Sequence, residues 1–138
     1  MSVRVTVSGA GRLAARLDRL ADQVEWAVQA AVEEGALDLR REARALLDVA
    51  GRGEASAPGE PPRRQTGALR DSLTVALAPD RLSARVGTDL DSGVHLEFGT
   101  KDTAPRPWLA PAAENVAPKI RARIEEALRQ AMIDATRN

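Results

Sequence analysis

The chain has 138 residues, with 20 Lys and Arg against 20 Asp and Glu, and it contains no cysteine. This length predicts one domain spanning residues 1–138, and the balanced charge argues against a general attraction to nucleic acid or to an anionic membrane. The absence of cysteine excludes disulfides, thiolate catalysis and cysteine-ligated metals. With one Phe, two Trp and no Tyr, the core must be mainly aliphatic, which favours completion of the hydrophobic surface by oligomerisation or docking.

Residues 3–7 alternate valine with polar side chains, which is the period-two pattern of a half-buried strand. Gly9 and Gly11 follow, and with Ala14 they superficially match a dinucleotide-binding fingerprint. That fold needs a second parallel strand carrying an acidic residue, whereas this chain continues with a helical pattern. We therefore expect a strand-to-helix turn and no bound nucleotide.

Residues 12–47 repeat apolar side chains in steps of three or four, which predicts one long amphipathic helix with a bend at Gly35. Trp26 lies beside the main apolar row. Two interpretations stay open for it: a partly buried side chain at the edge of the core, or a contact with another subunit.

Residues 49–65 are rich in proline and glycine and predict a long loop. Its three arginines, Arg52, Arg63 and Arg64, make it locally basic. The loop is either a solvated linker or a contact with a neighbouring subunit or with DNA phosphate.

Residues 66–71 then predict a short helical turn capped by Thr66, and residues 73–77 and 82–86 alternate as two strands joined by a turn. With the N-terminal strand, this hairpin makes a small antiparallel sheet. The long N-terminal helix and C-terminal helices would pack on it, so the expected fold class is α+β.

Residues 95–112 contain the sharpest change of pattern in the chain. Gly99 ends an apolar element at Phe98, and a Pro-Arg-Pro segment then leads into a new helix. In one interpretation, Phe98, Trp108 and Leu109 clamp this turn onto the core. In the other, an exposed Arg-Pro-Trp is a contact surface for another subunit.

The last part of the chain predicts helix with an interruption. Pro118 lies too deep for a first turn, so we expect a break or kink near residues 115–117. Beyond it, Glu125 is spaced to form ion pairs with Arg121 and Arg129 on a second amphipathic helix.

No catalytic or metal-binding constellation stands out. Acidic residues lie near the only histidine, His95, but a calcium loop starting at Asp89 would place Gly93 and Thr100 where ligands are needed. One histidine cannot supply a typical zinc site, and no serine elbow surrounds it. We expect no enzyme activity, no cofactor and no metal. Without a charged leader or a long apolar run, we also expect a soluble protein that is not exported.

Two motifs are more specific when taken together. The first reads Glu97-Phe98-Gly99-Thr100, then Ala104-Pro105-Arg106-Pro107-Trp108-Leu109 and Pro111-Ala112. The second, upstream, reads Pro58-Gly59-Glu60-Pro61-Pro62, then Thr66-Gly67-Ala68-Leu69-Arg70-Asp71-Ser72-Leu73. In this order and after a long first helix, the pair resembles the signature of the HK97 gp10-like family of tailed-phage neck or tail-completion proteins. The resemblance covers nearly the whole chain. Trp108 stands where the family more often has Phe, and Val94-His95 where Tyr or Ala often precedes the Glu-Phe-Gly-Thr run.

The resemblance implies a structural virion protein of the head-tail interface, a ring-forming subunit that joins the tail end to the DNA-filled head. It implies a homohexameric ring, contacts with a head-closure (stopper) or adaptor protein and with a tail tube or terminator protein, and DNA that passes nearby without sequence-specific binding. Assembly would take place in the bacterial cytoplasm, for a phage or a gene-transfer particle. Two alternatives stay open: a tail terminator that caps the tail tube and, from another class, a small nucleic-acid-binding regulatory protein.

The resemblance also marks residues. Those carried over as family motif and subunit contact are Thr66, Gly67, Leu69, Arg70, Glu97, Phe98, Gly99, Thr100, Pro105, Arg106, Pro107, Trp108 and Pro111. The loop residues considered as further contacts are Arg52, Arg63 and Arg64.

Overall fold

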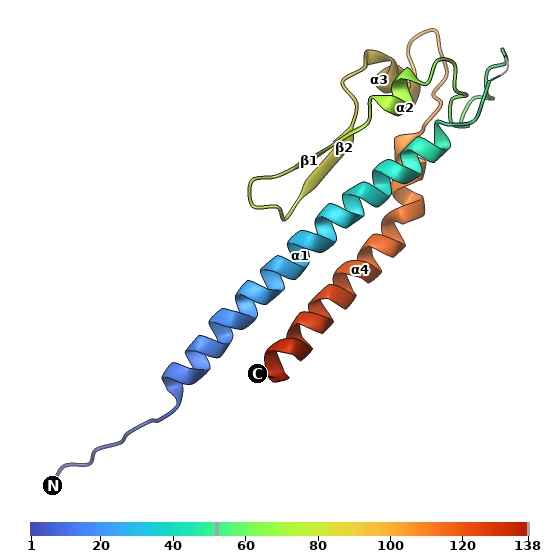
Figure 1. Ribbon diagram of the computed structural model, residues 1–138. Helices are drawn as coiled ribbons and strands as arrows, with labels where there is room; N and C mark the ends of the chain where they lie inside the picture. The colour runs from blue at the N-terminus through green and yellow to red at the C-terminus, as the bar shows by residue number, and fades with distance from the viewer. Residues whose placement is uncertain (52, 138) are drawn as a thin grey trace.

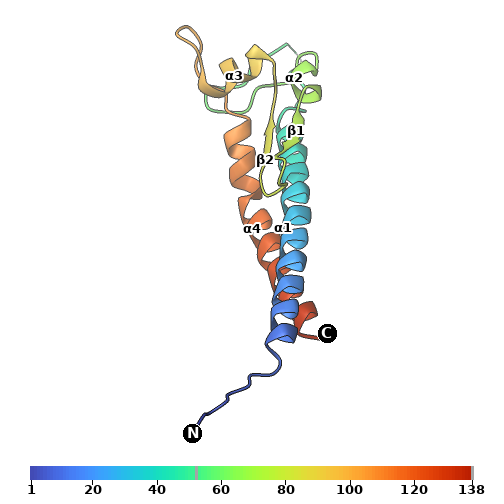
Figure 2. The same cartoon turned by 90° about the vertical axis from the view of Figure 1, so that its left-hand side faces the viewer.

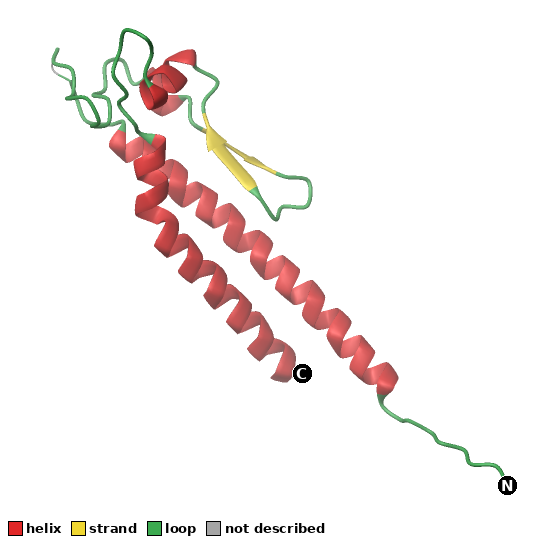
Figure 3. Cartoon of the chain, turned by 180° about the vertical axis from the view of Figure 1, so that it is seen from behind, coloured by secondary structure: helices red, strands yellow, loops and turns green. Residues whose placement is uncertain are grey.

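The computed structural model describes residues 1–51 and 53–137. Two long antiparallel helices lie side by side, and the shorter elements gather at one end of this pair (Figure 1). We call this end the compact end. The elements are α1 (Ala10–Leu46), α2 (Ala68–Asp71), β1 (Thr74–Leu77), β2 (Ala84–Gly87), α3 (Asp91–Phe98) and α4 (Leu109–Arg137). The predicted α+β class is confirmed, with helix as the dominant component (Figure 3).

The helix α1 spans the predicted region with no interruption at Gly35. A Cβ at this position would lie 3.1 Å from Cγ2 of Ile120 on α4. The glycine therefore lets the two helices approach closely, because there is no side chain to separate them. In place of the expected bend, Gly35 marks a point where α1 and α4 approach closely.

The helix α4 continues through Pro118, so of the predicted break or kink near residues 115–117 the break is not formed. The axis of α4 changes direction in its orange first half, as a kink would require (Figure 1). Proline removes one backbone hydrogen bond, but packing against α1 holds the helix on both sides of it. Val116 is buried before the proline, and Ile120 lies against Gly35 after it. The predicted pairing of Arg129 also differs, since its guanidinium lies 2.6 Å from Glu126 rather than pairing with Glu125.

The predicted N-terminal strand is not formed. Residues 1–8 form no strand and are exposed, and within residues 1–51 and 53–137 the sheet consists of β1 and β2 only. These two strands are antiparallel, with Val75 opposite Val86 and Leu77 opposite Ala84. The N-terminal segment continues beyond the start of α1 and away from the hairpin, so neither β1 nor β2 lies beside it (Figures 1 and 2).

The core lies in the compact end, where the end of α1 meets the start of α4. Its buried members are Ala43, Leu47, Leu73, Trp108 and Ala112. The remaining length of the helix pair is closed largely by alanines, including the buried Ala31 and Ala131. No helix in the described part of the chain is long and apolar enough to cross a membrane.

Candidate assembly surface

The Glu97 carboxylate caps the N-terminus of α4. Its Oε2 accepts hydrogen bonds from the backbone N–H groups of Trp108 (2.8 Å) and Leu109 (2.9 Å), and its Oε1 accepts one from Ala110 (2.9 Å). The first N–H groups of a helix have no partner within the helix, and a negative charge is favourable there. Glu97 thus joins the end of α3 to the start of α4.

Trp108 lies in the core with 2% of its surface exposed. Its indole Nε1 donates a hydrogen bond of 3.0 Å to the Gly93 carbonyl. Gly93 is itself closely packed, because a Cβ there would lie 2.5 Å from Cγ2 of Thr88. Of the two sequence interpretations, the clamp is therefore correct for Trp108, and the expectation of an exposed Arg-Pro-Trp is wrong at this residue.

The turn between α3 and α4 is closed by backbone contacts. Gly99 has a φ of 75°, and a Cβ on it would lie 2.8 Å from the Thr103 carbonyl oxygen. The Thr100 N–H donates to that same carbonyl at 2.9 Å. Arg106 donates from its backbone to Leu96 (2.6 Å) and from its Nε to the Ser56 carbonyl (3.0 Å). The Gly-Thr and Pro-Arg-Pro parts of the motif therefore build one rigid turn.

The upstream motif has a similar structural role. Thr66 Oγ1 accepts a hydrogen bond of 3.2 Å from the Ala68 N–H, and Gly67 has a φ of 83°. Leu69 packs against the core, and Arg70 pairs with Asp71 and with Asp48 at the end of α1. The motif therefore ties α2 to α1.

The loop arginines have different surroundings. Arg63 and Arg64 are exposed. The Arg64 side chain lies 3.6 Å from Asp48, and its backbone N–H donates to the Val49 carbonyl at 2.6 Å. Arg52 lies outside the described residues, so the contact predicted for it has no structural description. Pairing with Asp48 reduces the local positive charge that suggested a DNA contact.

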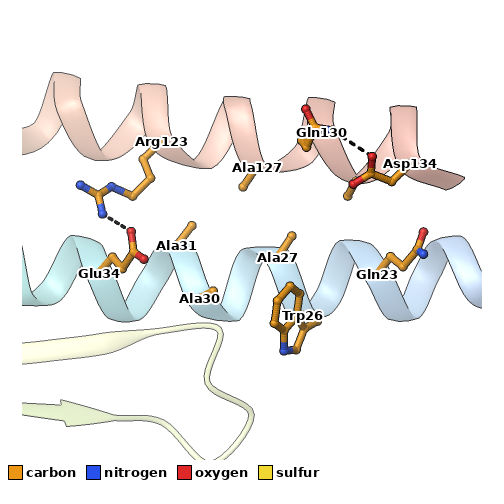
Figure 4. Close-up of a pocket in the computed structure, with 11 residues that line it drawn as sticks. Gln23, Trp26, Ala27, Ala30, Ala31, Glu34, Arg123, Ala127, Gln130 and Asp134 are labelled. Carbon is orange, nitrogen blue, oxygen red and sulfur yellow. Dashed lines mark hydrogen bonds and ion pairs between the residues drawn. The ribbon is translucent and has the colours of Figure 1, made fainter.

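Two of the three aromatic side chains lie on the surface. Trp26 is 73% exposed, so the interpretation of a partly buried Trp26 at the core edge is wrong. Phe98 is 76% exposed, so the clamp interpretation is wrong for Phe98. Figure 4 shows Ala27 and Ala127 facing each other between the helices, with Trp26 directed away from α4. The groove along these alanines has a volume of about 380 Å³.

A second apolar depression lies beside Phe98. We call it the Phe98 groove; it has a volume of about 390 Å³, and its lining includes Val94, Phe98, Trp108, Leu109 and Ala113. Val94 is 53% exposed, so two neighbouring apolar side chains of α3 face solvent here. Large apolar side chains that cluster on a surface mark contact sites more often than isolated ones do.

Residues 11–101 match the family model described as "Bacteriophage HK97-gp10, putative tail-component". This range is about two thirds of the chain. The chain belongs to this family. The resemblance to an HK97 gp10-like protein is thereby confirmed, and the coarse function is that of a phage tail component of the virion. No curated protein and no solved structure matches the chain.

The HK97-gp10-like match includes the upstream motif and the Glu-Phe-Gly-Thr run, and it ends before the Pro-Arg-Pro-Trp segment. The structure nevertheless unites the two parts, since Glu97 binds the helix start at Trp108. In the described residues, no group of three or more His, Asp or Glu side chains could hold a metal ion. The geometry of the motif is that of a structural joint.

A charged cluster around Asp38 lies between the two long helices of this HK97-gp10-like chain, and it was not predicted from the sequence. Asp38 is buried and pairs with Arg41 (2.6 Å), Arg123 (2.7 Å) and Lys119 (3.5 Å). Burial acts to raise the pKa of Asp38, but the hydrogen bond from Arg41 and the charges of Arg123 and Lys119 together hold that pKa below its ordinary value. An acidic residue directly beside Leu39 of the apolar row was the signal available in the sequence.

We expect the Asp38 cluster to make stability depend on pH. Because the folded-state pKa of Asp38 is lowered, its contribution is present in full above about pH 5. The contribution begins to fall near the ordinary aspartate pKa of about 4 and is lost as the pH drops further, through the lowered folded-state pKa. Replacing Asp38 by Asn should lower the free energy of unfolding by about 2 kcal/mol at pH 7. Urea unfolding at pH 7 and at pH 3 would measure it, and a difference between the two proteins that does not shrink at pH 3 would contradict the assignment.

Proposed function

We propose that this chain is a ring-forming neck or tail-completion subunit that joins the tail end of a phage, or phage-like particle, to the DNA-filled head. Its membership of a family of phage tail components supports the setting. The observation that carries the proposal is the exposure of Phe98 and Trp26, two of only three aromatic side chains in the chain. A subunit that will be covered by neighbours has reason to keep such side chains at its surface.

The rigid turn supports the same proposal. Phe98 is the last residue of α3, and Glu97 beside it is fixed to the start of α4 by three hydrogen bonds. The Phe98 side chain is thus presented from a backbone that is already ordered. Preorganisation of this kind lowers the entropy cost of association. On this proposal, the family motif builds the support and Phe98 makes the contact.

The other two functions from the sequence find less support. A nucleic-acid-binding regulator would need a basic surface, but the chain is neutral overall, and Arg64 and Arg70 pair with Asp48. A tail terminator would have the same setting and the same expected contacts. The morphology of particles made by variants therefore has to distinguish a terminator from a joining subunit. We propose no enzymatic activity, since the geometry of the motif accounts for its polar groups by helix capping and turn closure.

The test uses particles made from the encoding genome with the native gene replaced by variants. Phe98→Ser should reduce the number of joined particles about tenfold or more, because burying a Phe side chain contributes about 1.5–3 kcal/mol and each 1.4 kcal/mol is a tenfold change. Electron microscopy should show filled heads beside separate tails of normal length. Overlong tails would instead indicate a tail terminator.

Phe98→Leu is the matched control, because it keeps an apolar side chain at the same position and should retain joining. Both variants should unfold within about 0.5 kcal/mol of the parent, since Phe98 is exposed in the single chain. Normal joining by a stable Phe98→Ser protein would refute a contact at this residue.

A further inference from the structure

Residues 1–8, which we call the arm, have no partner within the described chain. Val3, Val5 and Val7 are 84%, 81% and 78% exposed. Among the described backbone hydrogen bonds outside helices and strands, none involves these residues. The arm therefore has the alternating apolar pattern of a strand, but its valines are not covered by any described part of the chain.

The hairpin of β1 and β2 has the complementary deficiency. It has only two strands of four residues each, and isolated two-stranded sheets are marginal in water. Val75 and Leu77 of β1 and Val86 of β2 are half-buried, whereas Thr74, Ala76 and Arg85 are exposed. In the described residues, no backbone hydrogen bond extends from the outer edge of either strand to another segment. Such an edge is a template for pairing with a further strand.

We propose that the arm of one copy pairs with the β1 edge of a second copy and forms the third strand of its sheet. This inference rests on the proposed assembly of copies into a ring. In this arrangement Val3, Val5 and Val7 would extend the apolar layer that contains Val75 and Leu77. Main-chain hydrogen bonds would provide affinity, and the alternating side chains would set the register.

The arm cannot reach its own β1. Eight extended residues span about 26 Å. The hairpin turn is fixed to α1 at Gln29, whose Nε2 donates to the Asp80 carbonyl at 3.1 Å. From Ala10 to Gln29 the helix rises about 28 Å, so an arm folded back along α1 would end before this turn. The strand β1 lies beyond the turn, towards the compact end (Figure 1). Pairing must therefore take place between copies.

Charge selects the β1 edge over the β2 edge. Arg4 belongs to the polar face of the arm, and the exposed side chain in the middle of β2 is Arg85. Like charges directly opposite each other on neighbouring strands are destabilising. The exposed residues of β1 are the uncharged Thr74 and Ala76, which place no cation beside Arg4.

This contact is heterologous, because each copy donates an arm and receives one. Head-to-tail contacts of this kind generate a ring when the rotation between copies closes. The arm therefore supplies a link that runs from copy to copy in one direction. It also explains why a strand pattern in the sequence has no strand in the single chain.

The absence of cysteine allows a direct cross-linking test. Ala76→Cys is combined in turn with Ser2→Cys, Arg4→Cys, Thr6→Cys and Ser8→Cys, so that every position on the polar face of the arm is sampled. Particles are oxidised and separated on non-reducing gels. We expect at least one pair to give a ladder of covalent multimers of the chain, because a disulfide requires Cβ atoms about 3.5–4.5 Å apart.

Arg85→Cys with the same arm variants is the matched control, since Arg85 is directly opposite Ala76 in the hairpin. It should give no ladder, because a third strand beside β1 leaves β2 one strand further away. A ladder only with Arg85→Cys, a cross-link within one chain, or no cross-link with Ala76→Cys in any register would overturn the inference. Immunoblotting of the same particles tests the proposed function separately: chain present without cross-links rejects the arm contact alone, and chain absent rejects the virion role.

A second pair of variants tests the face of the arm that is used. Val5→Asp places a charge in the apolar layer and should lower both the multimer yield and the number of joined particles about tenfold. Thr6→Asp places the same charge on the polar face and should leave both within about twofold of the parent. Equal effects of the two variants would contradict strand pairing.

Discussion

Replacing Trp108 by Ala is expected to lower the free energy of unfolding by about 3–5 kcal/mol, the largest effect of any single substitution considered for this chain. The indole is almost fully buried and donates its Nε1 hydrogen bond to Gly93. Removal of the indole leaves a cavity in the compact end and leaves the Gly93 carbonyl without its hydrogen-bond donor. Equilibrium unfolding in urea measures the change.

Trp26→Ala is the matched control for that experiment, because it removes the same side chain from an exposed site on α1. It should change the free energy of unfolding by no more than about 0.5 kcal/mol. If the two substitutions had equal effects, Trp108 would not be the centre of the core, and the clamp between α3 and α4 would be refuted.

Replacing Glu97 by Ala is expected to cost about 3 kcal/mol, because three backbone N–H groups at the start of α4 lose their acceptor. Glu97→Gln keeps the size and one acceptor oxygen, so it should cost about half as much. Glu114→Ala, at an exposed acid on the same helix, should have little effect. Urea unfolding of the three variants gives the comparison, and a Glu97→Ala protein as stable as the parent would contradict the cap.

The elements that periodicity could predict are those in which one face of a segment meets the core of its own chain. The rhythm of α1, the hairpin and the turn at Gly99 all follow from local patterns, and all are present. The role of Glu97 could not be predicted in this way, because its partners begin 11 residues later and meet it only after the turn has folded. The role of Gly35 could not be predicted either. From the sequence it indicates a bend, and only the fold shows that Ile120 packs against it.

The errors have physical causes that are specific to each site. Pro118 predicts a break from local rules, but contacts with α1 on both sides outweigh one lost hydrogen bond. The alternation of Val3, Val5 and Val7 states which side chains share a face but not which chain covers them. Trp108 and Phe98 were equally apolar candidates, and only the fold shows that one is buried and the other exposed.

The same distinction explains what the family motif does. Its glycines, prolines and Glu97 fix a turn, and Trp108 anchors this turn in the core. The residues left for contact are those the turn presents, with Phe98 first among them. Because supporting and contacting residues are adjacent in sequence, a motif alone cannot separate the two roles.

The most direct test of the virion role is electron cryomicroscopy of purified, joined particles made from the encoding genome. We predict a ring of this chain at the head-tail interface, with Phe98 at the compact end of each subunit against a neighbouring protein. Six copies are expected from the family resemblance. Joined particles that contain no copy of the chain, or that carry it at a site away from the tail and neck, would contradict the account.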